Sequence, residues 1–197
     1  MSSDLSAPAA IRPRKVRSDS IENRERVLAA AREVFAESGL DALIPDIAAR
    51  AGVGKGTVYR HFPSKEALIQ AILDAYWRQL ETMRQQALAN DDPWAGFAGL
   101  LRGMISVKDE QRAASEILIA SKGTRPKDPV YARIDETLVV LFRRAQEAGI
   151  ARPDVPAATM PLVLRSTHWA VKYGRDLRLD WQPYLQAVLD GLRAGRS

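Results

Sequence analysis

The chain has 197 residues, 46% of them hydrophobic, a formal net charge of +5 and no cysteine. It is long enough to bury a substantial core in one or two domains, and without thiols it has no disulfide, cysteine-ligated zinc or cysteine nucleophile. No segment approaches the roughly 18 apolar residues of a membrane span, and the N-terminal MSSDLSAPAA lacks the features of a signal peptide. We therefore expect a cytoplasmic protein without a membrane partner.

The first residues of the chain are rich in Ser, Ala and Pro and include a basic cluster. This composition predicts a flexible arm at residues 1–18, which is either a solvated tail or an accessory contact to DNA. A helical period begins near Ser20 and is expected to end at Gly39, a residue suited to the position after a helix. The basic cluster consists of Arg12, Arg14, Lys15 and Arg17. The apolar face of the helix consists of Val27, Leu28, Ala31, Val34 and Phe35.

Two short helices are predicted next, at residues 46–51 and 55–61, with Gly52 between them. A small residue in the first helix, a glycine at the turn and apolar residues that lock the pair are typical of a helix-turn-helix. The locking residues are expected to be Ile47, Ala48, Ala51, Val53 and Val58. From residue 47 to 65 the chain carries four basic residues and no acidic one. This local charge favours a polyanion such as DNA as the partner of the second short helix.

The stretch GVGKGT at residues 52–57 is similar in part to the phosphate-binding loop of an NTPase. The Walker A element has the pattern G-x-x-x-x-G-K-[ST] and follows a buried strand. Here Gly56 directly follows Lys55, and an Ala-rich amphipathic segment precedes the loop. The NTPase interpretation therefore fails on spacing and on context.

A longer helix is expected to begin after Ser64, placed as its N-cap, and to carry an apolar stripe from Leu68 to Met83. Further helical patterns occur near residues 94–105, 117–120, 130–145, 157–173 and 183–194. The sequence shows neither strand alternation nor an internal repeat. It therefore predicts an all-α fold of about nine helices, with a helix-turn-helix domain at residues 19–66 and a second helical domain at residues 67–197.

The stretch from Arg24 to Ile69, RERVLAAAREVFAESGLDALIPDIAARAGVGKGTVYRHFPSKEALI, resembles the DNA-binding region of the tetracycline-repressor (TetR) family. The resemblance rests on I-A-x-x-A-G-V, then G-T-V-Y-x-H-F, then S-K-E-x-L, and covers nearly all of that region. The rest of the chain resembles the family only in its helical organisation. Membership implies a homodimeric repressor that leaves a palindromic operator when a small molecule binds.

The resemblance assigns phosphate contacts to four residues. Thr57 and Tyr59 would offer hydroxyl groups to the DNA backbone, and His61 would offer a ring nitrogen. Lys65 lies at a helix N-terminus, where free amides and the helix dipole also attract an anion. Two structural alternatives stay open, because Tyr59 could be a half-buried packing residue and His61 could cap its own helix.

The candidates for contacts to base edges are Lys55 and Arg60, since both can donate to guanine acceptors. Arg60 could instead be a solvated residue at the rim. The chain departs from the family at two positions where a hydroxyl residue is common. It has Leu43-Ile44-Pro45 at the start of the first short helix and Gly54 at the start of the second. These departures predict fewer phosphate contacts and a greater dependence on the basic arm.

The second helical domain is expected to bind an effector and to form the dimer. Its aromatic residues could line an apolar cavity for a small molecule of unknown identity, or could belong to the core. The candidates are Trp77, Trp94, Phe97, Met104 and Phe142, with Tyr131 and Trp169 as further possibilities. The resemblance places the dimer interface on the last two helices. The stripe expected to meet the partner consists of Tyr184, Leu185, Val188, Leu189 and Leu192.

An enzyme is hard to build from this sequence. Its two histidines, His61 and His168, are expected far apart, and no carboxylate–histidine spacing indicates a metal site. We therefore expect no catalytic residues, no metal and no cofactor, and we expect His168 to be a satisfied interface residue. A membrane-surface protein with basic amphipathic helices is the remaining alternative. It is disfavoured because the basic residues of the later helices alternate with acids.

Overall fold

The computed structural model describes residues 13–110, 113–114, 117–118, 129–177 and 179–195. These residues contain eight α-helices, two short 3-10 turns and a single antiparallel bridge between Ala151 and Arg193, so the described part has the all-α fold expected. The helices are α1 (Pro13–Ser38), α2 (Ile44–Ala51), α3 (Lys55–His61), α4 (Lys65–Leu88), α5 (Pro93–Glu110), α7 (Pro129–Glu147), α8 (Met160–Asp176) and α9 (Gln182–Leu192). Of the helix predicted near residues 117–120, Ile117 and Leu118 are helical and residues 119–120 lie outside the described residues.

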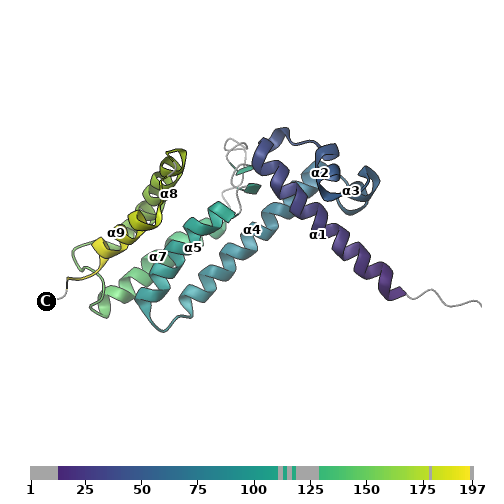
Figure 1. Cartoon of the computed structure of the whole chain (residues 1–197). Helices are drawn as coiled ribbons and strands as arrows, with labels where there is room; N and C mark the ends of the chain where they lie inside the picture. Colours follow the sequence, from purple (N-terminus) through teal and green to yellow (C-terminus); the bar gives the residue numbers. More distant parts are fainter. Residues whose placement is uncertain (1–12, 111–112, 115–116, 119–128, 178, 196–197) are drawn as a thin grey trace, which may run out of the picture.

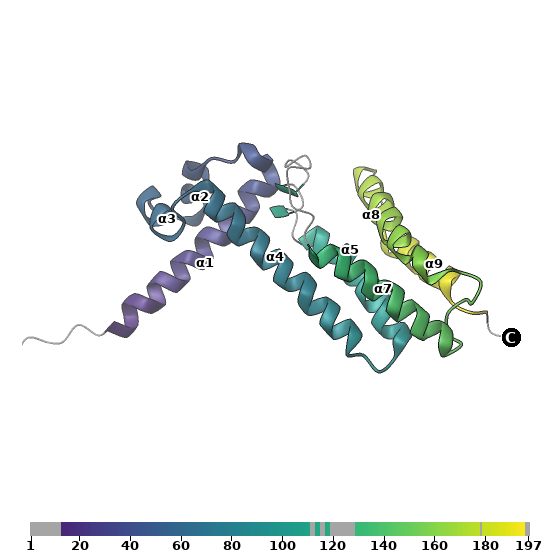
Figure 2. The same cartoon turned by 180° about the vertical axis from the view of Figure 1, so that it is seen from behind.

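The helices form a head and a body joined by α4. Figures 1 and 2 show α1, α2 and α3 gathered at one end, with α4 running from this head into the body. In the body α4, α5 and α7 pack against one another, and α8 packs on α5 and α7. The pair α8 and α9 forms the outermost layer, at the end of the molecule away from α3 (Figures 1 and 2).

The first helix begins earlier than expected. The sequence predicts an arm at residues 1–18, but α1 begins at Pro13, so residues 13–18 are helical. Proline suits the first turn of a helix, because its fixed φ is helical and its missing N–H is not needed there. Of the predicted basic cluster, Arg12 lies outside the described residues. The boundary expected at residue 66 falls in the first turn of α4, which belongs to both head and body.

The helix ends follow the local sequence. Gly39, Gly52 and Gly149 have φ of 53°, 66° and 70°, the left-handed conformation that glycine adopts without a Cβ penalty. Ser64 caps α4 as expected, its hydroxyl accepting a hydrogen bond from the Ala67 N–H at 3.1 Å. The helix α2 begins at Ile44 rather than Asp46, with Pro45 in its first turn.

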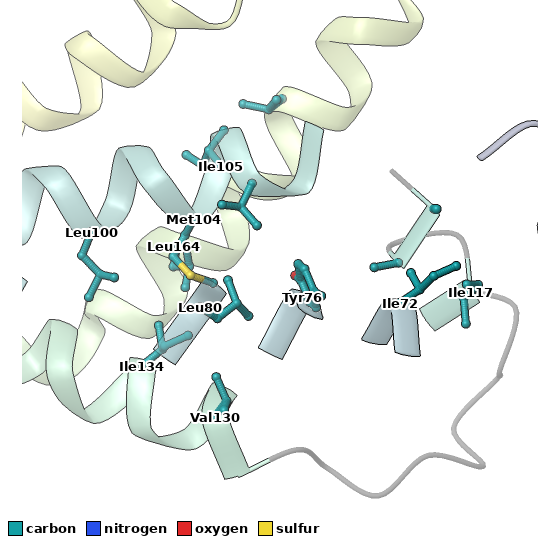
Figure 3. Close-up of a cluster of buried hydrophobic side chains, with 14 of the residues drawn as sticks. Ile72, Tyr76, Leu80, Leu100, Met104, Ile105, Ile117, Val130, Ile134 and Leu164 are labelled. Carbon is teal, nitrogen blue, oxygen red and sulfur yellow. The ribbon is translucent and has the colours of Figure 1, made fainter. Parts of the chain in front are cut away.

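The core of the body lies between α4, α5, α7 and α8. Figure 3 shows Tyr76 and Leu80 of α4, Met104 of α5 and Leu164 of α8 pointing toward one another, and Ile134 of α7 beside them. All of these side chains are buried. Burying an aliphatic side chain of this size contributes about 1.5–3 kcal/mol, so this cluster sets the relative positions of the four helices.

The apolar stripe of α9 is not free for a partner subunit, contrary to our expectation. Leu185, Leu189 and Leu192 are buried within their own chain, which leaves only Tyr184 exposed and Val188 half-buried. The end of α9 is held by the turn after α7, where the Arg152 N–H donates to the Leu192 carbonyl at 3.0 Å and the Ala194 N–H to the Ile150 carbonyl at 2.9 Å. The stripe therefore completes the core of the monomer.

Candidate DNA-binding site

The turn between α2 and α3 is built as the sequence predicts. Ile47, Ala48, Ala51 and Val58 are buried, and Val53 is half-buried against the same core. Gly52 adopts its left-handed conformation between the helices, and the Val53 N–H donates to the Ala48 carbonyl at 3.0 Å. These contacts fix the angle between α2 and α3 and leave one face of α3 turned outward.

Side chains of α1 hold this turn in place, a role that sequence reasoning missed. Arg26 donates from Nη2 to the carbonyl of Ala51 at 2.7 Å, at the end of α2. Arg50 of α2 forms ion pairs with Glu33 at 2.9 Å and Glu37 at 3.1 Å. The hydrogen bond from Arg50 lowers the pKa of Glu37, and the same contacts raise the pKa of Arg50. Because its charge is matched by α1, Arg50 belongs to the packing of the head.

The outward face of α3 carries the predicted DNA-binding residues. Lys55, Arg60 and Tyr59 are exposed, the last with 49% of its surface accessible, and Thr57 is half-buried. Tyr59 is therefore not the packing residue that was the alternative. The helix lies at the outer edge of the head (Figures 1 and 2). No ion pair involves Lys55 or Arg60 in the part of the chain that the structure describes. Their charges are free to meet a polyanion.

His61 is less exposed than Lys55, Tyr59 and Arg60. The residue is half-buried at the end of α3, and its Nε2 is shielded from solvent without a hydrogen-bond partner. A phosphate contact from this residue would have to come from Nδ1, or would require the ring to turn. In the ring orientation that the structure shows, Nδ1 is the nitrogen left for the predicted phosphate contact.

Lys65 is the first residue of α4 and already has a partner in the head. Its Nζ donates to the carbonyl of Leu40 at 2.5 Å, in the turn after α1. The ammonium group has three donors, so one bond to a carbonyl leaves two for a phosphate. The contact places the charge between the N-terminus of α4 and the turn after α1.

The two departures from the family pattern leave the starts of α2 and α3 without a side-chain cap. Leu43 occupies the N-cap position of α2 and Gly54 that of α3, and neither gives a side-chain capping bond. The amide groups at these two helix starts have no side-chain hydroxyl beside them. A backbone phosphate could approach them directly.

Comparison with known proteins agrees with this geometry. The family model described as bacterial regulatory proteins, tetR family, matches residues 27–72, and the one described as the C-terminal domain of SbtR-like transcriptional regulators matches residues 92–194. The second match covers more than half of the chain. The chain belongs to the TetR family of transcriptional regulators.

Individual relatives support the assignment. The uncharacterised HTH-type transcriptional regulator TtgW of Pseudomonas putida is 37% identical over 135 residues, which are 68% of this chain and 91% of the relative. The repressor KstR2 of Rhodococcus jostii is 28% identical over 184 residues, covering 86% and 90% of the two chains. The crystal structure of a TetR regulatory protein from Mycobacterium vanbaalenii is 32% identical, with a TM-score of 0.60, and the match covers 91% of this chain and 99% of that one.

The aromatic residues that we expected to line an effector cavity lie in the body of this TetR-family chain. Trp94, Phe97 and Phe142 are buried and pack on one another, with ring centroids 5.7 Å and 5.2 Å apart, and Arg193 lies over the Trp94 ring at 4.9 Å. Met104 belongs to the core in Figure 3. Packing within the chain accounts for the burial of these four side chains.

Trp77 differs from the other four candidates because it is only half-buried. Its ring contacts Tyr76, with centroids 4.9 Å apart, and meets Tyr131 edge to face at 5.5 Å. The hydroxyl groups of Tyr76 and Tyr131 share a hydrogen bond of 2.9 Å between α4 and α7. This cluster combines partly accessible aromatic surface with hydroxyl groups.

The helix α8 presents an exposed apolar face that sequence reasoning missed. Trp169 and Leu162 have 73% and 65% of their surface accessible, and Tyr173 stacks beside Trp169 with centroids 6.5 Å apart. Trp169 therefore does not line a cavity within the chain. Its neighbour His168 turns inward, with Nε2 3.0 Å from the Met104 carbonyl, so it is satisfied as expected but by α5 of its own chain.

Among the residues that the structure describes, no group of three or more His, Cys, Asp or Glu side chains is arranged to hold a metal ion. No helix in the same part of the chain is long and apolar enough to cross a membrane.

Proposed function

We propose that this TetR-family regulator is a cytoplasmic repressor that binds a palindromic operator as a homodimer and leaves it when a small, largely apolar molecule binds to the body. The observation that carries the proposal is the outward face of α3, where Lys55, Tyr59 and Arg60 are exposed on a rigid helix-turn-helix. The relative KstR2, a repressor, supports the direction of regulation.

The DNA contacts divide into two kinds. Lys65 and the hydroxyl groups of Thr57 and Tyr59 hold phosphates, with His61 contributing through Nδ1. These contacts position the head on the duplex without reading its sequence. Lys55 and Arg60 reach base edges in the major groove, where each good pairing contributes about 1–3 kcal/mol of discrimination.

The effector contacts the half-buried Trp77 and Tyr131 between α4 and α7. Because α4 connects this cluster to the head, a ligand that favours another position of α4 lowers DNA affinity. Thermodynamic linkage then requires that DNA lower the affinity for the ligand by the same factor. A molecule that binds tightly without changing operator affinity would not be the inducer.

The operator part of the proposal is tested with the DNA that flanks the coding sequence. Footprinting of the full chain should protect an inverted repeat whose half-sites are about 34–36 Å apart, or a multiple of this spacing. Fluorescence anisotropy should then show much weaker binding when one half-site is scrambled. Equal affinity for the intact and half-scrambled DNA would contradict the palindromic dimer, and no preference over random DNA would contradict specific binding altogether.

A further inference from the structure

A pocket of about 510 Å³ lies between α1 and α4. The two helices cross where the head joins the body, as Figures 1 and 2 show. The pocket is lined by Arg24, Glu25, Leu28 and Arg32 from α1 and by Asp74 and Arg78 from α4, with alanines between them. Its volume lies in the range of pockets that bind small molecules. It is distinct from the outward face of α3 and from the Trp77–Tyr131 cluster.

The three arginines of this pocket are not neutralised. No carboxylate lies within 4.0 Å of Arg24, Arg32 or Arg78 among the residues that the structure describes. The Arg24 guanidinium carbon lies over the Phe62 ring, 5.1 Å from its centroid, in a cation–π contact. The pocket thus presents three cations from two helices.

Arg32 carries the clearest sign of an absent partner. Its Nε is shielded from solvent and has no hydrogen-bond partner. A buried donor without an acceptor costs free energy, which an oxygen atom would recover if the side chain turned this donor toward the pocket. A guanidinium binds carboxylate and phosphate groups through two parallel N–H bonds, so this side chain is suited to an oxyanion.

The acidic residues of the pocket do not cancel its charge. Glu25 and Asp74 contribute two negative charges against three positive ones, and Asp74 already accepts a hydrogen bond from Gln70 Nε2 at 2.7 Å. The formal charge of the pocket lining is therefore positive. A ligand with more than one anionic group could reach arginines on both helices at once.

We propose that the pocket between α1 and α4 binds a small multivalent oxyanion, a polyphosphate or a polycarboxylate, held by Arg24 and Arg32 on one side and Arg78 on the other. The helix α1 packs on α2 and α3, whereas α4 packs on the body. A ligand that bridges the two helices therefore fixes the orientation of the head relative to the body. This site would act on DNA binding from a place separate from the effector site.

The proposal is tested by isothermal titration of the full chain with pyrophosphate and, separately, with citrate, at an ionic strength held constant with sodium chloride. The two titrations show whether phosphate or carboxylate is the better ligand. We expect saturable binding of at least one of them. Arg32→Gln and Arg78→Gln should each weaken it about tenfold, and Asp74→Asn, which removes a competing charge, should tighten it.

The control is Arg143→Gln, which removes one exposed positive charge from α7. It should leave anion binding unchanged. Anion affinity is expected to fall in Arg78→Gln and to rise in Asp74→Asn. Loss of folding would lower it in both variants, so the opposite changes separate the effect of the site from loss of folding. Absence of saturable binding, or equal losses in Arg143→Gln and Arg78→Gln, would overturn the proposal. So would an Arg78→Gln variant that binds DNA more weakly but binds both anions unchanged, because its arginine would then serve DNA phosphates.

Discussion

At the scale of single residues, Lys55 and Lys65 should differ in what they contribute to DNA binding. Lys55 is exposed on α3, and we expect Lys55→Ala to lose about 1–3 kcal/mol on the operator and little on random DNA. Lys65→Ala should weaken both DNAs alike and reduce the salt slope by about one unit per charge, or about two in a symmetric dimer. Titrations against both DNAs at several salt concentrations measure these effects.

A second variant tests whether the effect of Lys65→Ala comes from the lost charge. Its Nζ also bonds the Leu40 carbonyl, so Lys65→Ala could loosen the turn after α1. Lys65→Gln keeps an N–H donor for the Leu40 carbonyl and removes the charge, and it should give the same salt slope as Lys65→Ala. If Lys55→Ala keeps full discrimination between the two DNAs, Lys55 contacts the backbone and the sequence is read by Arg60, Thr57 or the N-terminal arm.

The glycine of the turn supports a second prediction at this scale. Gly52 has a φ of 66°, and a Cβ there would lie 2.9 Å from Arg26 Nη2, which holds the end of α2. Gly52→Ala should therefore destabilise the head by about 1–2 kcal/mol, the cost of a left-handed conformation with a side chain. Gly56→Ala, inside α3 with open space around it, should instead stabilise by up to about 1 kcal/mol. Thermal melts of the two variants should shift in opposite directions.

The sequence predicted which side chains of α3 point outward but not which groups surround them. Spacing along a helix puts Arg60 nearly opposite the buried Val58 and puts Lys55 and Tyr59 together on one face, and all three are exposed. The bond from Lys65 to the Leu40 carbonyl and the burial of His61 Nε2 depend on how α4 and the turn after α1 meet α3. Such contacts between distant segments leave no local pattern in the sequence.

At the scale of helices, Glu81 joins α4 to α7 and should make stability depend on acid. It accepts from Arg84 at 2.7 Å and pairs with Arg133 of α7 at 3.3 Å. The hydrogen bond from Arg84 is the main cause that lowers the pKa of Glu81 to about 2 from its ordinary 4.5. The folded chain thus holds this proton less tightly than the unfolded chain. The stabilisation is complete above about pH 4.5 and is lost as pH falls toward 2.

We expect Glu81→Gln to lower the free energy of unfolding near pH 7 by about 0.5–1 kcal/mol, since the partners are partly exposed. The difference from the unmodified chain should shrink near pH 3, where Glu81 contributes less. Urea denaturation at the two pH values measures both quantities. Glu147→Gln, which removes an exposed carboxylate at the end of α7, serves as the control. A difference between Glu81→Gln and the unmodified chain that stays constant with pH would contradict the assigned role of the carboxylate.

Most helices were predictable because caps and apolar periods are local, and α3 has the predicted bounds. The faces of α8 and α9 were not. Both helices carry apolar residues, and α8 has two such faces, an inner one with Leu164 and Val171 and an outer one with Leu162 and Trp169. A single sequence shows that a helix has two apolar faces but not which one its own chain covers. That choice depends on the position of α5 and α7.

At the scale of the whole molecule, the exposed face of α8 indicates how two chains assemble. Leu162, Trp169 and Tyr173 are exposed on one face of α8 by their helical spacing, and Tyr184 of α9 is exposed as well. An apolar patch of this kind on a soluble monomer marks an interaction site. A two-fold axis would bring the same patch of two copies together, and each head would then be free to meet one half of an operator.

We therefore expect Leu162→Glu combined with Trp169→Glu to give a folded monomer that binds the operator far more weakly, because one head alone gains only half of the contacts. Sedimentation at micromolar concentration should show a monomer. A thermal melt should show that the fold is retained. Val140→Glu, which adds a negative charge at an exposed apolar residue of α7, should leave assembly unchanged.

Leu189→Ala should instead affect the fold, destabilising the chain by about 2–5 kcal/mol because the Leu189 side chain fills the core of the monomer. If the doubly charged α8 variant stays dimeric while changes in α9 give a folded monomer, the interface lies on α9 and the burial of its stripe must change on assembly.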